Sequence, residues 1–89
     1  MALRLRGLPF SAQDQDIIAF FSNHKLLTDS IKIGQNEDGR ATGQAVVLFE
    51  SANDAETAMN ELQGQNVGHR WIELIQIPYN DYSNFTNGG

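Results

Sequence analysis

Apolar and polar residues alternate strictly near the start of the chain, in Leu3-Arg4-Leu5-Arg6. A period of two is typical of a strand with one buried face, so we expect the leucines to face the core and both arginines to lie on the opposite face. The segment Gly7-Leu8-Pro9 ends this strand. A last strand is predicted over residues 71–77, where Pro78, which has no backbone N–H to donate, ends the apolar and aromatic run.

Two segments place apolar residues at helical spacing behind a helix-start signal. Ser11-Ala12-Gln13-Asp14 offers a serine N-cap with a carboxylate three residues later, which predicts a helix over residues 12–23. Ser51-Ala52-Asn53-Asp54 repeats nearly the same signal and predicts a second helix of similar length before Gly64. The apolar stripes consist of Ile17, Ile18, Phe20 and Phe21, and of Ala55, Ala58, Met59 and Leu62.

Between the helices, residues 30–33 and 44–49 are predicted strands. A polar loop with the reversal signal Asp38-Gly39 joins them into a hairpin. The resulting order is βαββαβ. It describes an α+β, ferredoxin-like architecture, with a four-stranded antiparallel sheet and both helices on one face.

The chain divides into one predicted domain, residues 1–78, and a segment of different composition, residues 79–89. The second segment is rich in asparagine, serine and glycine and carries a single charge, Asp81. Chain ends are usually poorly ordered, so we expect a flexible tail or linker. Its aromatic residues Tyr79, Tyr82 and Phe85 recur every three positions, and folding back across the sheet is the alternative.

Composition and charge narrow the function classes. The 89 residues hold no cysteine and two histidines, so we expect no disulfide, no metal and no cofactor. The absence of a membrane-length apolar run or a signal peptide predicts a soluble, intracellular, monomeric domain without membrane contact. The net charge of −5 argues against a strongly electrostatic nucleic-acid binder, although Arg4, Arg6 and Arg70 fall in or beside predicted strands and leave room for a basic sheet edge.

Two short motifs place an arginine and an aromatic residue at the edge of a predicted strand. They are Arg6-Gly7-Leu8-Pro9-Phe10 and Gly68-His69-Arg70-Trp71-Ile72-Glu73. An arginine donates two hydrogen bonds to the acceptor edge of guanine, and an aromatic ring stacks on the face of a base. Together these side chains suit an unpaired nucleobase.

The RNA recognition motif is the commonest nucleic-acid module with this architecture, and its two central strands normally display aromatic residues that stack on bases. Thr42-Gly43-Gln44-Ala45-Val46-Val47-Leu48-Phe49 resembles one of those strands. Gln44 and Val46 replace its stacking rings, however, and Arg4 replaces the ring of the first strand. The sheet face is therefore not expected to be a stacking platform.

Loss of these rings, together with the two end motifs, resembles the quasi-RNA recognition motif (qRRM) of the heterogeneous nuclear ribonucleoprotein F/H family and related splicing regulators. The resemblance covers residues 3–77 and includes Asp38-Gly39-Arg40-Ala41-Thr42-Gly43. It implies binding of single-stranded, guanine-rich RNA through loops, in pre-mRNA splicing or RNA processing. It also implies a nuclear location, with a cytoplasmic one left open, and sister domains or splicing proteins as partners.

Under this resemblance the candidate RNA-binding residues are Arg4, Arg6, Phe10, Arg40, Arg70 and Trp71. Arg6 and Phe10 match the family's arginine and aromatic residue around the first strand. Arg70 and Trp71 match its pair at the last strand. The chain departs from the family pattern at Gly64, where a basic residue is usual, and in a longer loop at residues 34–38.

Simpler structural explanations stand beside these assignments. Phe10 would be a hydrophobic staple at the start of the first helix, and Trp71 a partly buried strand residue. Arg4 and Arg6 would pair with an acidic side chain on a neighbouring strand, such as Glu73, and for Arg4 we favour this explanation.

Two other function classes compete with RNA binding. A protein-interaction module that keeps the fold but has little RNA affinity is favoured by the acidic charge, the missing rings and Gly64. Acylphosphatase is an enzyme of the same fold class, but Ser11 follows Phe10 where that enzyme has an arginine that holds phosphate. No catalytic residues and no enzymatic activity are therefore expected.

Overall fold

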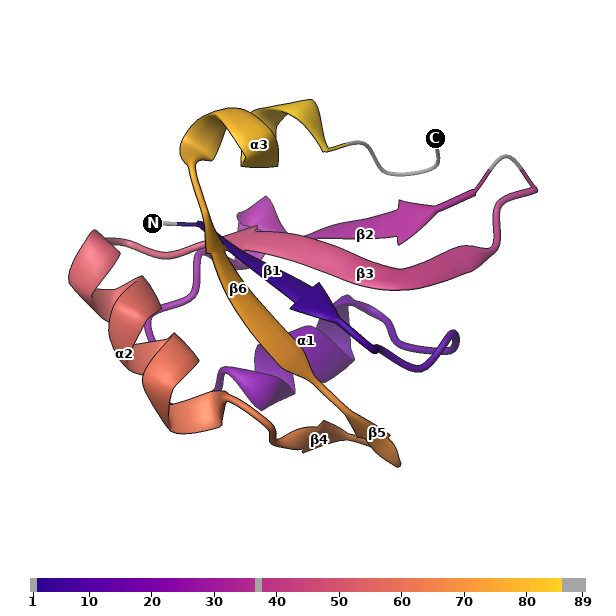
Figure 1. Cartoon of the computed structure of the whole chain (residues 1–89), viewed down its shortest axis with the longest axis horizontal. Coiled ribbons are helices and arrows are strands. Elements are labelled where there is room, and N and C mark those ends of the chain that lie inside the picture. The colour runs from indigo at the N-terminus through magenta and orange to yellow at the C-terminus, as the bar shows by residue number, and fades with distance from the viewer. Residues whose placement is uncertain (1, 37, 86–89) are drawn as a thin grey trace.

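The elements of the chain follow the predicted order, with a short hairpin and a third helix added. The computed structural model describes residues 2–36 and 38–85. The elements are β1 (Ala2–Arg6), α1 (Asp14–Phe20), the 3-10 helix η1 (Thr28–Ser30), β2 (Lys32–Gln35), β3 (Ala41–Leu48), α2 (Ala52–Leu62), β4 (Asn66–Val67), β5 (Arg70–Trp71), β6 (Glu73–Ile77) and α3 (Tyr79–Asn84). An antiparallel four-stranded sheet has the order β2-β3-β1-β6, which confirms the ferredoxin-like fold (Figure 1).

One face of the sheet packs against α1 and α2 and forms the main core. Leu3 and Leu5 of β1 are fully buried there, as their alternation predicts, in one cluster with Ile17 of α1. Phe21 and Phe49 meet edge to face with ring centroids 5.2 Å apart, a favoured geometry for aromatic pairs. The core therefore leaves the even-numbered positions of β1 on the opposite face.

The two long helices begin differently from each other. The α2 N-cap is Ser51, as predicted, and its hydroxyl accepts the backbone N–H of Asp54 at 3.1 Å. The predicted Ser11 cap of α1 is wrong: Gln13 is the N-cap, and its N–H donates to the Asp16 carboxylate at 2.8 Å. A turn in which the Ala12 N–H donates to a carbonyl three residues earlier keeps Ser11 in the loop and shortens α1. Within the described residues no helix is long and apolar enough to cross a lipid bilayer.

The last predicted strand, residues 71–77, is interrupted at Ile72. This fully buried side chain joins the main core, while its N–H donates to the Gln65 carbonyl at 2.9 Å and its carbonyl accepts from the Gly64 N–H. The chain before Ile72 pairs with β4 and forms a hairpin, and the chain after it pairs with β1. The interruption sets the Arg70–Trp71 strand apart from the main sheet.

The segment after β6 differs from the flexible tail that the sequence favours. Residues Tyr79–Asn84 form α3, which lies across the sheet face opposite α1 and α2 (Figure 1). Tyr82 is 7% exposed and packs against Ala2, Val46 and Ile77 of the sheet. The alternative of folding back therefore holds over residues 79–85, and residues 86–89 lie outside the described part of the chain.

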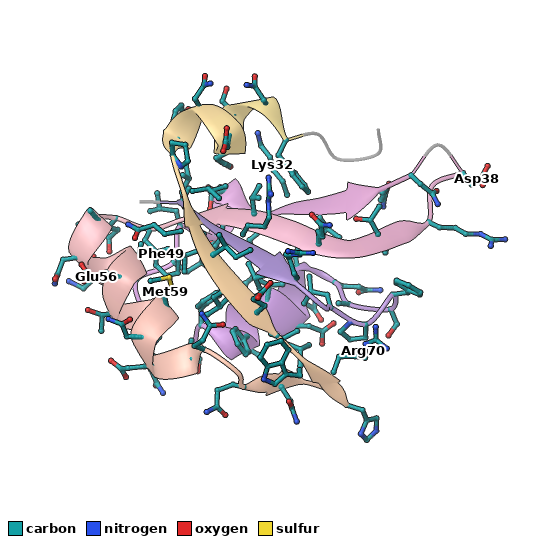
Figure 2. The ribbon with its side chains drawn as sticks, in the orientation of Figure 1. Lys32, Asp38, Phe49, Glu56, Met59 and Arg70 are labelled. Atoms are coloured by element: carbon teal, nitrogen blue, oxygen red, sulfur yellow. The ribbon has the colours of Figure 1, made fainter. Side chains whose placement is uncertain are left out.

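Lys32 of β2 stabilises the packing of α3 on the sheet. Its ammonium group donates to the carbonyl oxygens of Tyr82 at 3.0 Å and Phe85 at 3.3 Å, and lies 4.2 Å from the centroid of the Tyr82 ring (Figure 2). Cations are favoured at the carbonyl end of a helix and over an aromatic face. These contacts hold α3 over one end of the sheet face and leave the other end open.

The Tyr82 phenol gives the domain a pH dependence at high pH. Burial, with the neighbouring Tyr79 adding to it, raises the pKa of Tyr82 above its ordinary value of 10.0. As pH rises, the unfolded chain loses the Tyr82 proton before the folded chain does. The contribution of Tyr82 to the free energy of unfolding is therefore fully present below pH 10 and falls above it, by up to about 1.4 kcal/mol per pH unit. Urea unfolding of Tyr82→Phe should show a flatter profile above pH 10 than the wild type, whereas Tyr79→Phe, which removes only the smaller of the two causes, should keep most of the wild-type slope.

Candidate nucleic-acid interface

Arg6 and Trp71 are brought together by the close approach of two backbones. Gly7, directly after β1, has a φ of +90°, and a Cβ built on it would lie 2.5 Å from the carbonyl oxygen of Trp71. Real Cβ atoms do not come so near, so only glycine allows the chain after β1 to lie against β5. The arginine that precedes Gly7 is thereby placed beside the tryptophan strand.

Trp71 presents its ring to solvent at this point. The residue is 59% exposed, which does not suit the alternative of a partly buried strand residue. One edge of the indole lies over Gly64, where a built Cβ would be 3.1 Å from the indole Nε1. The basic residue that is usual at this position in the family would therefore compete with the indole for space, which gives a physical reason for glycine here.

Arg6 carries the ion pair that sequence reasoning offered as an alternative. Its guanidinium lies 3.4 Å from the Glu73 carboxylate, and the two side chains are 55% and 44% exposed. Arg4 does not form the pairing favoured for it. It lies two residues before Arg6 in β1, between Val46 and Ile75, and its Nε is buried without a hydrogen-bond partner among the described residues.

Phe10 lies on the other side of the loop that follows β1. It is 72% exposed, so it does not act as a buried staple for α1. Its ring lies beside Gly43, where a built Cβ would be 3.6 Å from Cε1, and it borders a hollow of about 450 Å³ that Arg40 also lines. A second hollow, of about 640 Å³, lies between the Phe10 loop and β2. The ring therefore has open space beside it and a cation within the same hollow.

Arg70 projects from the β4–β5 hairpin near the loop after β1 (Figure 2). Gly68 at the hairpin turn lies close to this loop, because a Cβ built there would be 4.0 Å from the Pro9 ring. In the same loop Leu8, the residue before Pro9, donates its N–H to the Gly43 carbonyl at 2.9 Å. The loop is thus held between the hairpin and the start of β3.

The six predicted residues fall into two groups and one separate position. Arg6, Arg70 and Trp71 lie at the hairpin side of the loop, and Phe10 and Arg40 lie at its β2–β3 side. Arg4 lies apart, towards the centre of the sheet face. The arrangement offers one aromatic ring and at least one arginine in each group.

Sequence reasoning did not identify Gln44 and Asn36 as parts of this surface. Gln44 is the register partner of Arg6 on β3, on the side opposite Glu73. The Asn36 side chain accepts the backbone N–H groups of Asp38 and Arg40 at 2.9 and 3.0 Å, which closes the loop that carries Arg40. Gln44 could have been found only by aligning β3 with β1, because its place beside Arg6 follows from strand register. Asn36 could have been found from the preference of asparagine for turns that its side chain closes.

Comparison with known proteins identifies the fold family. A family model described as an RRM domain matches residues 3–89. The chain belongs to the RNA recognition motif family. This family is a class of RNA-binding, non-catalytic domains, in agreement with the sheet and helices described above.

Relatives place the chain among the qRRMs of the heterogeneous nuclear ribonucleoprotein F/H family. It is 38% identical to heterogeneous nuclear ribonucleoprotein H of Rattus norvegicus over 83% of this chain and 16% of that protein, and 33% identical to heterogeneous nuclear ribonucleoprotein F of Bos taurus over 96% and 20%. The Glorund qRRM2 crystal structure matches with a TM-score of 0.86 and 36% identity over 96% of this chain and 97% of that one. G-rich RNA sequence binding factor 1 from Homo sapiens matches with a TM-score of 0.79 and 29% identity over 90% and 82%. This RRM spans at most about a fifth of the curated relatives cited.

Proposed function

We propose that this qRRM binds single-stranded, guanine-rich RNA through loop residues rather than through the face of its sheet. The observation that carries the proposal is the exposed Trp71 ring on a strand whose backbone lies against Gly7, the residue directly after Arg6. A ring that stacks on a base and a guanidinium that donates to its edge are the two elements of single-strand recognition. Phe10 with Arg40 offers a second such combination.

The sheet face lacks the aromatic rings that stack on bases in other RRMs, which supports binding through the loops. Gln44, Val46 and Arg4 stand where the family's stacking rings usually are, and Val46 is buried beneath α3. A base arriving at that end of the sheet would have to displace Tyr82. The accessible aromatic rings of this region lie instead in the loop after β1 and in the hairpin.

Binding energy in this mode comes from stacking and base-edge contacts more than from phosphate neutralisation. Stacked bases contribute about 1–3 kcal/mol each, and a bidentate arginine–guanine pair about as much. Micromolar affinity is therefore attainable despite the net charge of −5. With about two or three ionic contacts, the slope of log K against log salt should lie between about −1.4 and −2.

The names of the relatives suggest the biological setting. The names of its relatives support a place in a nuclear ribonucleoprotein. We further propose that the domain acts in pre-mRNA splicing or RNA processing, as the resemblance to the qRRM family implies. Those relatives are several times longer than this chain, which fits a domain that works beside sister domains. Linked domains gain affinity through effective concentration, so modest affinity of one domain is sufficient.

Titration of a short guanine-tract RNA tests the proposal, with Trp71 fluorescence as the readout because Trp71 is the only tryptophan. Saturable quenching by the guanine tract but not by a pyrimidine tract is expected, with the shallow salt slope given above. Phe10→Ala should weaken it. A slope near −5, or no signal up to about millimolar RNA, would contradict the loop mode.

The alternative is a protein-interaction module with the same fold. The acidic net charge and the cover of α3 over the sheet face favour it. Absence of binding to both RNAs, with the domain folded, would make it the better explanation.

A further inference from the structure

A row of three polar side chains crosses the open end of the sheet. Gln44 of β3, Arg6 of β1 and Glu73 of β6 are direct register partners, so their side chains lie on the same face of the sheet. The neighbours of Arg6 and Glu73 along their strands, Leu5 and Leu74, are buried on the helix side. The row therefore faces away from the core, on the face that α3 covers only at its far end.

The next rows of the sheet differ sharply in chemistry. Val46, Arg4 and Ile75 form the adjacent row, and Leu48, Ala2 and Ile77 the row after it. Tyr82 of α3 packs on this apolar part of the face. Phe85, which follows α3, reaches the β2 side of the polar row, since a Cβ built on Gly34 would be 3.0 Å from its ring and 3.2 Å from the Gln44 carbonyl. The Arg6 and Glu73 part of the row is thus left for a ligand, and its carboxylate lies two residues from Trp71 in the chain.

The side-by-side guanidinium and carboxylate match one base edge in particular. Guanine presents an acceptor, O6, next to two donors, N1–H and N2–H, on its Watson–Crick edge, a face that single-stranded RNA leaves readable. Arg6 supplies donors only and ionised Glu73 acceptors only, 3.4 Å apart. Adenine in the same orientation presents a donor to Arg6 and an acceptor to Glu73, and the reverse orientation offers Glu73 one donor group instead of the two of guanine.

We propose that Glu73 determines the specificity of this site: its carboxylate accepts the N1–H and N2–H of a guanine whose O6 accepts from Arg6. This assignment rests on the proposed function and adds the residue that rejects other bases. A carboxylate beside RNA repels phosphates, so Glu73 favours binding only when a base offers it donors. Its replacement should then weaken guanine binding and leave adenine binding equal or stronger.

The test compares wild type, Glu73→Gln and Glu56→Gln on guanine, inosine and adenine tracts. Inosine lacks only the 2-amino group, so the ratio of guanine to inosine affinity reports the contact to N2–H. Glu56 is exposed on α2, far from Arg70 in Figure 2, and its variant makes the same charge change. Circular dichroism establishes that each variant is folded.

We expect wild type and Glu56→Gln to prefer guanine over inosine by about tenfold, the value of a hydrogen bond to a charged group. Glu73→Gln should reduce that ratio to about twofold and leave adenine binding undiminished. An unchanged guanine-to-inosine ratio in Glu73→Gln would reduce Glu73 to an ion-pair partner of Arg6 and overturn the assignment alone. Wild type that binds no guanine tract would overturn the proposed function itself.

Discussion

Replacing Trp71 by alanine is expected to lower the affinity for a guanine tract by about 5- to 150-fold. This range corresponds to the loss of about 1–3 kcal/mol when a stacked ring is removed. The ring is 59% exposed, so its removal should cost the fold little. Anisotropy of a labelled RNA measures the affinity, because the variant has no tryptophan to report binding.

Tyr79→Ala provides the matched control. Tyr79 is also 59% exposed but lies on α3, at the opposite end of the molecule from β5 (Figure 1). Its removal should change the affinity by less than twofold. Equal losses in the two variants would mean that the RNA does not distinguish the hairpin side from the α3 side, and Trp71→Phe should keep most of the affinity if stacking is the cause.

The fold could be predicted from the sequence because its signals are local. The alternation around Leu3 and Leu5 and the cap at Ser51 both act within a few residues, and both are found in the structure. The Ser11 signal failed because it competes with a turn that draws the chain away from helical geometry. Gln13 supplies the cap instead, two residues later.

The position of α3 could not be predicted in the same way. The helix is held on the sheet by contacts of Tyr82 with Ser30 and Lys32, which lie 52 and 50 residues earlier in the chain. The local composition of residues 79–85 is polar and weakly charged, which is equally typical of a tail. Only the folded sheet supplies the carbonyl, the cation and the apolar surface that make the helix favourable.

The candidate site was predicted residue by residue but not as an arrangement. Arg6 and Trp71 were identified from the type of side chain that holds a base, whereas their proximity depends on Gly7. The Glu73 carboxylate was considered only as an ion-pair partner, because its alignment with Gln44 follows from strand register. Contacts across strands thus decide the chemistry of a surface that sequence motifs merely suggest.

Gly7→Ala is expected to lower the free energy of unfolding by about 2–5 kcal/mol. A left-handed φ costs a residue with a side chain about 1–2 kcal/mol. The added methyl group would also lie 2.5 Å from the backbone oxygen of Trp71, and such overpacking costs about 1–3 kcal/mol more. Urea unfolding followed by Trp71 fluorescence measures the loss.

Gly39→Ala separates the two costs, because Gly39 has a similar φ of +80° but its built Cβ has no atom of the described residues within 4 Å. It should lose only the conformational part, about 1–2 kcal/mol. Gly7→Ala should also weaken guanine-tract binding at temperatures where it remains folded, since the chain must move Trp71 away from Arg6 to admit the methyl group. Equal destabilisation of the two variants would mean that the loop and the hairpin are not in contact, and the Arg6–Trp71 arrangement would lose its structural basis.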